Sequence, residues 1–109
     1  TDLSGAILKY ADLSSCTLKE VKLSNANLIG VDFKDAFCSE TQIDEANFEG
    51  ADLTYANLEG SNLKNSFFLE ANLHGTNFTN ANLADAYLVD ANIAKAITKG
   101  ANLENTILE

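Results

Sequence analysis

The chain has 109 residues and a formal net charge of −9, because sixteen acidic side chains face seven lysines and no arginine. This length predicts one domain, residues 1–109. The charge and the lack of Arg argue against direct nucleic-acid binding, which requires basic groups that neutralise phosphates. The longest apolar run has four residues, too short to cross a bilayer, so we expect no membrane insertion.

A leucine or a substitute for it recurs at every fifth residue from Leu3 to Leu108, with no change of register. Fourteen of these 22 positions are Leu, and the others are Phe, Ile, Cys38 and Thr98. Two residues before each of them lies a small residue, most often Ala, and the residue between is usually Asn or Asp. The chain is therefore one pentad, A-(D/N)-L-x-x, repeated from end to end.

A period of five fits neither a helix nor a flat strand. On a helix, successive leucines would lie about 140° apart, and on a strand they would alternate between the two faces. They share one interior only if the chain turns a corner in every pentad. The small residue and the Leu then point inward from a short strand, and the last two residues form the corner. The fifth position holds turn-forming residues that tolerate positive φ: all six glycines, Asn25, Asn65, Asn80, Asn105, Asp35, Asp85 and Asp90.

The middle position of the pentad indicates how many sides one coil has. Its apolar members all have numbers ending in 7, whereas positions ending in 2 are polar throughout. An even number of sides keeps these two classes on separate faces, and four is the smallest even number that closes. The pattern predicts a 20-residue coil and, at about 4.8 Å per layer, a rod roughly 26 Å long.

These pentads resemble those of the pentapeptide-repeat family over the whole chain. The resemblance implies an all-β fold, a right-handed quadrilateral parallel β-helix (solenoid) with about five and a half coils of 20 residues. The handedness comes from the resemblance alone.

No set of residues predicts catalysis, a cofactor or a metal site. Cys16 and Cys38 are at inward positions, roughly 8 Å apart, beyond disulfide reach, and we expect both to be buried. His74 is alone on an outward position. Asp12, Asp32 and Asp52 form an outward column, which is either a cation site or, as we favour, a set of local hydrogen bonds to the turns. Stacked like charges are expected to raise the pKa of these carboxyl groups.

One face changes from polar to apolar toward the C-terminal half, and the last coil lacks a cap. Clustered exposed apolar side chains mark an interface, unless they fold down along the corners. The candidate interaction surface comprises Phe67, Leu69, Tyr87, Val89 and Ile107 on the face, with Leu103 and Leu108 at the end. We expect something to cover the ends, either another copy or removed segments, and we prefer a closed two-fold, end-to-end dimer that satisfies unpaired strand groups.

The functional prediction is a non-enzymatic, rigid solenoid that acts as a protein-interaction or structural scaffold, with protein partners that include a second copy. The alternative is an acidic DNA mimic that binds a type II topoisomerase, as some members of the family related to quinolone resistance do. This chain shares their repeat and acidity but lacks their loops and helical cap. We expect a soluble chain in the cytoplasm, with a processed lumenal or periplasmic form as the other option.

Overall fold

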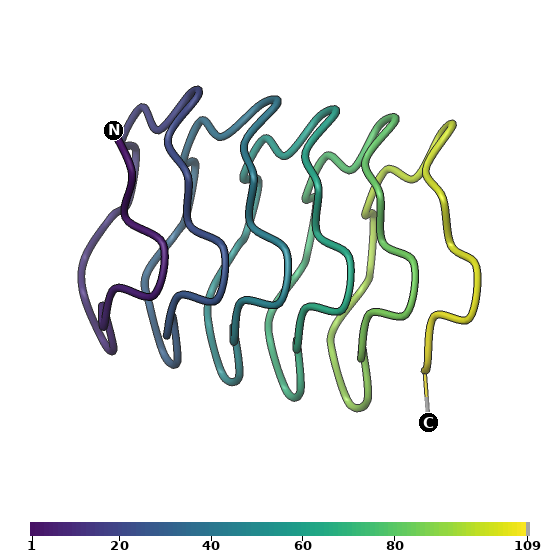
Figure 1. Cartoon of the computed structure of the whole chain (residues 1–109). Helices are drawn as coiled ribbons and strands as arrows, with labels where there is room; N and C mark the ends of the chain where they lie inside the picture. Colours follow the sequence, from purple (N-terminus) through teal and green to yellow (C-terminus); the bar gives the residue numbers. More distant parts are fainter. Residues whose placement is uncertain (109) are drawn as a thin grey trace.

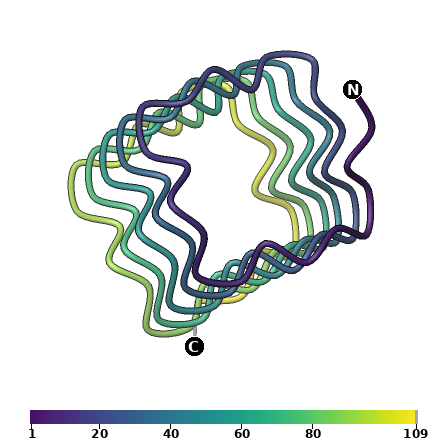
Figure 2. The ribbon, with the colours of Figure 1, turned by 90° about the vertical axis from the view of Figure 1, so that its left-hand side faces the viewer.

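The computed structural model describes residues 1–108, which wind as stacked coils around one axis (Figure 1). Within these residues there is no helix and no extended strand: each pentad has one β-bridge residue followed by a two-residue turn. The molecule measures 29 × 22 × 21 Å. Viewed along the axis, the coils superpose around a four-sided outline (Figure 2). None of the described residues forms a helix long and apolar enough to cross a membrane.

Parallel bridges connect each coil to the next. Every bridge joins a residue to the one twenty positions later, from Asp2 with Lys22 to Tyr87 with Ile107. The predicted 20-residue period is therefore confirmed as the register between layers. The predicted short strands are replaced by single bridge residues, because the two-residue turn in each pentad leaves no room for a longer pairing.

The leucine positions fill the interior. In the central coils these side chains are fully buried, as at Leu53, Leu58 and Phe48. The phenyl rings of Phe48 and Phe68, one layer apart, are stacked with centroids 4.9 Å apart, and Phe33 meets Phe48 edge-on at 5.8 Å. Identical positions in successive coils thus form continuous columns of apolar contact, the arrangement typical of a solenoid.

Small polar residues replace Ala at several inward positions without leaving polar atoms unpaired. The hydroxyls of Ser61, Ser66 and Thr76 each donate to the carbonyl of the residue 23 positions earlier, at 2.7, 2.9 and 2.8 Å. These carbonyls belong to leucine-type positions of the preceding coil. Among the described residues, no buried side-chain oxygen or nitrogen lacks a hydrogen-bond partner. Ser and Thr at these inward positions therefore meet the requirement that buried polar groups be hydrogen-bonded.

Every corner residue has positive φ, whatever its type. The set includes residues that the turn-former rule does not predict, such as Tyr10 at 62°, Tyr55 at 57° and Lys95 at 59°. A non-glycine residue in this region costs about 1–2 kcal/mol. Each pentad is bridged to the coils on both sides, or on one side in the first and last coils, and this stacking overrides the local preference of the residue.

Glycine is required at some corners because a large side chain from the previous coil lies over it. A Cβ atom built on Gly75 would lie 2.5 Å from the ring of Tyr55, twenty residues earlier, and Gly30 lies under Tyr10 in the same way. Gly50 has the same backbone conformation, with φ of 65°, but no neighbouring atom within 4 Å of such a Cβ. The tyrosine and glycine corners therefore form stacked pairs.

Candidate interaction surface

The predicted apolar face is present and accessible. Phe67, Tyr87 and Ile107 follow one another in a column joined by parallel bridges, and their side chains are 47%, 41% and 37% exposed. The rings of Phe67 and Tyr87 lie 6.3 Å apart at 32°. In the preceding layers the same column holds Ile7, which is 78% exposed in the first coil, and then Asn27 and Asn47. The face thus changes from amide to aromatic between residues 47 and 67.

A groove lies where this change occurs. Its volume is about 370 Å³, and it is lined by Asn47, Glu49, Phe67, Leu69 and Tyr87. Leu69 is only partly exposed, and so is Val89, which does not line the groove. The aromatic rings stand out from the face while the aliphatic side chains beside them lie closer to the corner. The sequence left open whether these side chains are exposed or fold down along the corners. The aromatic rings are exposed, and Leu69 and Val89 are partly buried.

The end of the described chain forms a second hollow. Leu103 and Leu108 are 45% and 56% exposed, and with Ile93, Leu83 and Leu88 they line an apolar cavity of about 330 Å³. No residue lines both this end cavity and the groove. The side face and the end, which the sequence analysis distinguishes, therefore carry separate hollows. Val89 and Ile107 line neither of them.

The backbone gives the end of the coil a definite hydrogen-bonding polarity. In an inner pentad, the third and fifth residues donate toward the next coil, as in Leu53 N–H to Asn72 C=O (2.8 Å) and Tyr55 N–H to His74 C=O (2.9 Å). The first residue accepts from that coil, as Ala51 C=O does from Asn72 N–H. Each pentad thus presents two donors and one acceptor toward the C-terminal side. In the last coil, the N–H groups of the third and fifth residues have no acceptor within residues 1–108. They belong to Ile93, Lys95, Thr98, Gly100, Leu103, Asn105 and Leu108.

This polarity argues against the two-fold, end-to-end dimer preferred from the sequence. Two C-terminal edges placed face to face would oppose donors to donors and leave at least one N–H of each pentad without an acceptor. A buried N–H without a partner costs about 1–3 kcal/mol. The complementary surface is the N-terminal edge, where the second and fourth residues of each pentad present C=O groups, as Asp12 and Ser14 do. A two-fold contact at this end therefore does not satisfy the unpaired backbone groups.

Thr98 lies in the end cavity and not in a closed core. Its side chain is exposed, because no further coil covers this layer within the described residues. Thr98 occupies a leucine position, but its hydroxyl is not buried, unlike the hydroxyls of Ser61 and Thr76, which donate to carbonyls of the preceding coil.

The two cysteines are both free. Cys38 is buried, and this burial, with a smaller effect of Cys16, raises the pKa of its thiol to about 12. Cys16 is only partly buried, contrary to expectation, because it lies in the first coil and has a layer on one side only. The thiolate, which is the nucleophilic form of cysteine, is therefore strongly disfavoured at Cys38.

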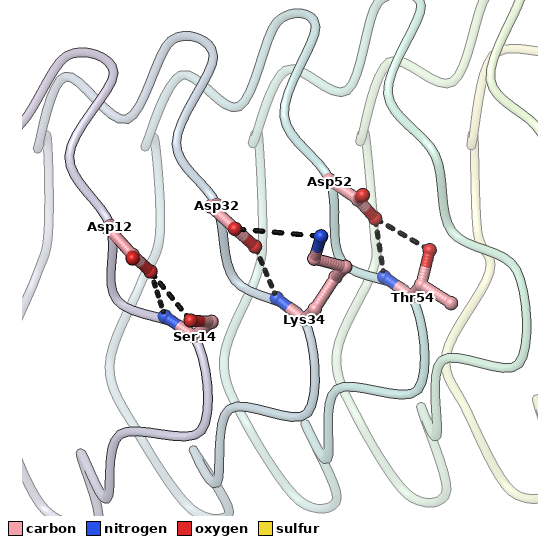
Figure 3. Close-up of polar contacts among 6 residues, drawn as sticks. All are labelled: Asp12, Ser14, Asp32, Lys34, Asp52 and Thr54. Carbon is pink, nitrogen blue, oxygen red and sulfur yellow. Dashed lines mark hydrogen bonds and ion pairs between the residues drawn. The ribbon is translucent and has the colours of Figure 1, made fainter.

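The column of aspartates makes local hydrogen bonds, as favoured from the sequence (Figure 3). The Oδ1 atoms of Asp12, Asp32 and Asp52 each accept the backbone N–H two residues later, at 3.0, 3.1 and 3.0 Å. The expected rise in pKa is wrong for Asp12. Hydrogen bonds from the Ser14 hydroxyl and N–H lower the pKa of that carboxyl below its usual 3.8. The described residues contain no group of three potential metal ligands.

His74 lies beside Tyr55, where Nε2 and the phenol oxygen are 3.4 Å apart and the rings meet edge-on. This contact belongs to the stacked corner in which Tyr55 covers Gly75. A nucleophile next to His74 would be needed for the usual histidine-assisted catalysis, and the two cysteines are on the inside of the coil.

Comparison with known proteins identifies the family. A family model described as a pentapeptide repeat region matches residues 25–97, and a second, described as pentapeptide repeats, matches residues 1–35. The chain belongs to the pentapeptide repeat family. Its fold is accordingly a right-handed β-solenoid.

Among solved structures, the pentapeptide repeat protein Rfr23 from the cyanobacterium Cyanothece 51142 matches with a TM-score of 0.95 and 28% identity. The match covers 99% of this chain and 88% of Rfr23. HetL, a pentapeptide repeat protein involved in heterocyst differentiation regulation in the cyanobacterium Nostoc, matches at 0.51 and 24% identity, over 98% of this chain and 65% of HetL. QnrB1, a plasmid-mediated fluoroquinolone resistance protein, reaches 0.47 at 20% identity, over 99% of this chain and 77% of QnrB1. No curated protein gives a significant match.

Proposed function

We propose that this chain is a non-enzymatic, rigid scaffold of about five and a half 20-residue coils that binds protein partners through the apolar side face of its C-terminal half. The observation that carries the proposal is the groove of about 370 Å³ beside Phe67 and Tyr87. Exposed clusters of aromatic and aliphatic side chains with a concave shape are typical of protein interfaces.

Rigidity supports a scaffolding role. The inner columns are packed without unpaired buried polar atoms among the described residues, and each layer is bonded to the next by several backbone hydrogen bonds. A partner would therefore meet a preformed surface and would not have to order it, which reduces the entropic cost of binding.

The chemistry of the possible nucleophiles favours binding over catalysis. Cys38 is buried with a pKa of about 12, and His74 contacts the phenol of Tyr55 and neither cysteine. The groove and the end cavity are lined mainly by apolar side chains, with Glu49 as the one acidic residue among them. A third hollow is lined by Tyr10, Glu49 and Glu70 beside Ile29 and two glycines. None of the three is lined by a histidine or a cysteine, the residues most often used as base and nucleophile.

Affinity capture from the organism of origin tests this proposal. Wild-type protein, Phe67→Ser/Tyr87→Ser and Phe37→Ser serve as baits; Phe37 is 43% exposed on a different side of the coil and is the matched control. We expect a set of partners retained by wild type and Phe37→Ser and lost with the double variant. Equal retention by all three baits would contradict a binding role for this face.

Acidity supports a second candidate, a DNA mimic that binds a type II topoisomerase. Nine net negative charges over a 29 Å axis give roughly one charge per 3.2 Å, about half the density of duplex DNA, which has one per 1.7 Å. This difference is why we place the mimic second. A gyrase supercoiling assay tests this candidate. Inhibition by the purified protein at micromolar concentration would favour the DNA mimic, and unchanged supercoiling would exclude it.

A further inference from the structure

We propose that the partner segment which fits the groove is a basic, amphipathic α-helix that lies along the axis of the solenoid. This inference rests on the proposed interaction role of the side face and specifies the chemistry of what binds there.

Side chains, not backbone, must make the contact. At the groove, Phe67 N–H donates to Ala46 C=O (2.9 Å) and Phe67 C=O accepts from Phe48 N–H (2.7 Å). Tyr87 is bonded in the same way to Ser66 and Phe68. Both backbone groups of each residue are thus used between layers. A partner cannot add a strand to this face, and binding through a groove by anchoring side chains is the alternative.

The spacing of the anchors favours a helix over an extended peptide. Successive layers place the backbones of Phe67, Tyr87 and Ile107 at intervals of about 4.8 Å, so two layers span about 9.6 Å. The rings of Phe67 and Tyr87 lie 6.3 Å apart, close to the rise of about 6 Å between helix residues four positions apart. On a helix, residues three and seven positions apart rise about 4.5 and 10.5 Å. On a strand, residues two and four positions apart rise about 6.6 and 13 Å. An apolar helical stripe therefore stays in register with all three residues of this column. A strand fits the spacing of the two rings but passes the third residue by about 3 Å.

Charge around the groove specifies a cationic partner. Glu49 lines the groove itself. The corners at the two ends of this side carry further exposed carboxylates: Glu45, Glu70, Asp85 and Asp90. The pentads of this side and of the corner before it, residues 41–50, 61–70 and 81–90, contain one lysine, Lys64. Lys or Arg residues that flank the apolar stripe of a helix would pair with these carboxylates, and the same carboxylates disfavour a second copy of this acidic chain.

The combined pattern describes the ligand. Its apolar side chains occupy helix positions that repeat every three or four residues, and they pack against Phe67, Leu69 and Tyr87. Its basic side chains lie on both borders of that stripe. Because exposed ion pairs contribute little to affinity, the aromatic residues are expected to supply most of the binding energy and the carboxylates the preference for basic over acidic helices.

Fluorescence anisotropy with synthetic peptides tests the inference. The probe is a fluorescein-labelled peptide of about two heptads, with Leu at the a and d positions and Lys and Ala elsewhere. One control has the same composition with the Leu residues spread around the helix, and another has Glu in place of Lys. We expect the Leu/Lys helix to bind and both controls to bind at least about tenfold more weakly.

Protein variants locate the site. Phe67→Ser/Tyr87→Ser is expected to weaken binding of the Leu/Lys helix by about tenfold or more, and Glu49→Gln by about threefold. Phe37→Ser should leave the affinity unchanged. Thermal melts of each variant establish that these surface changes leave the protein folded.

The outcomes separate this inference from the proposed function. Absence of binding, equal binding of the scrambled peptide, or equal loss with Phe37→Ser would overturn the helix proposal. If the peptide fails but the double variant still loses its captured partners, the face binds proteins of another chemistry. If both experiments fail, the proposed function fails as well.

Discussion

At the scale of the residue, the corners show how the stack determines backbone conformation. Tyr10, Tyr55 and Lys95 adopt the positive φ that is otherwise typical of Gly and Asn. The sequence predicted turns at the fifth position, and it predicted this conformation only for Gly, Asn and Asp. Residue preferences could not give the rest, because the conformation is set by the stack and by the turn hydrogen bond across the corner. Ala11 N–H donates to Leu8 C=O (3.0 Å) around Tyr10, and Ala96 N–H donates to Ile93 C=O (3.1 Å) around Lys95.

The stacked tyrosine and glycine corners give a prediction. Gly75→Ala and Gly50→Ala both place Ala at positive φ, and this alone should cost about 1 kcal/mol of unfolding free energy. Gly75→Ala must also displace the ring of Tyr55, which should cost about 1 kcal/mol more in lost packing. Urea denaturation measures the difference. Adding Tyr55→Ala to Gly75→Ala should remove the extra loss; equal losses in the two single variants would contradict the stacked contact.

The serine-bonded aspartates give a second prediction at this scale. The Ser14 hydroxyl is the largest cause of the lowered pKa of Asp12, so Ser14→Ala should raise that pKa toward its usual 3.8. Because the folded-state pKa is lowered, the contribution to stability is present above the unfolded pKa and lost as pH falls through the folded one. Carbon NMR titration measures the change, with Asp2, which is bonded to Ser4 in the same way, as the control. An unchanged Asp12 pKa would assign the shift to another cause.

At the scale of the element, the unit of structure is the pentad within its layer. The sequence was sufficient to predict this unit: the leucine positions are the buried core, and the 20-residue register follows from the alternation of apolar and polar middle positions. The ends differ from the centre. Leu53 and Leu58 have a layer on both sides and are fully buried, whereas Leu3 and Leu108 are 36% and 56% exposed.

This difference predicts a gradient of stability along the axis. Leu53→Ala or Leu58→Ala should leave a cavity and lower the unfolding free energy by about 2–5 kcal/mol. Leu3→Ala and Leu108→Ala should each lower it by less than about 1 kcal/mol, because these side chains are already partly in water. Chemical denaturation of the four variants makes the comparison. Similar losses at the centre and the ends would be incompatible with a one-dimensional stack.

At the scale of the whole molecule, the direction of the peptide groups distinguishes the two ends. The sequence could not show this, because residue types do not reveal which way each N–H points. It predicts an apolar side face and an open apolar end in the C-terminal half, and the structure has a groove at the first and a cavity at the second. The C-terminal edge is rich in N–H donors and the N-terminal edge in C=O acceptors, so copies that associate by their ends are expected to do so head to tail.

Sedimentation velocity on a polypeptide of these 109 residues tests that expectation. Wild type at high micromolar concentration should form species that grow beyond a dimer, as open head-to-tail contacts do. Leu108→Asp should abolish them, and Phe67→Ser/Tyr87→Ser should not. A wild-type protein that stays monomeric would show that the end contact does not form. Growth that stops at a dimer would indicate a closed two-fold pair instead.

The central claim is that the side face of the C-terminal half is where partners bind. Photo-crosslinking tests it most directly, with benzoylphenylalanine placed at position 67 in one variant and at position 37 in another. Both native residues are phenylalanines of similar exposure, 47% and 43%, so the substitutions are matched. In extract from the organism of origin, we expect a discrete crosslinked partner from position 67 and none from position 37. Crosslinks of equal yield from both positions, or none from position 67, would contradict the account.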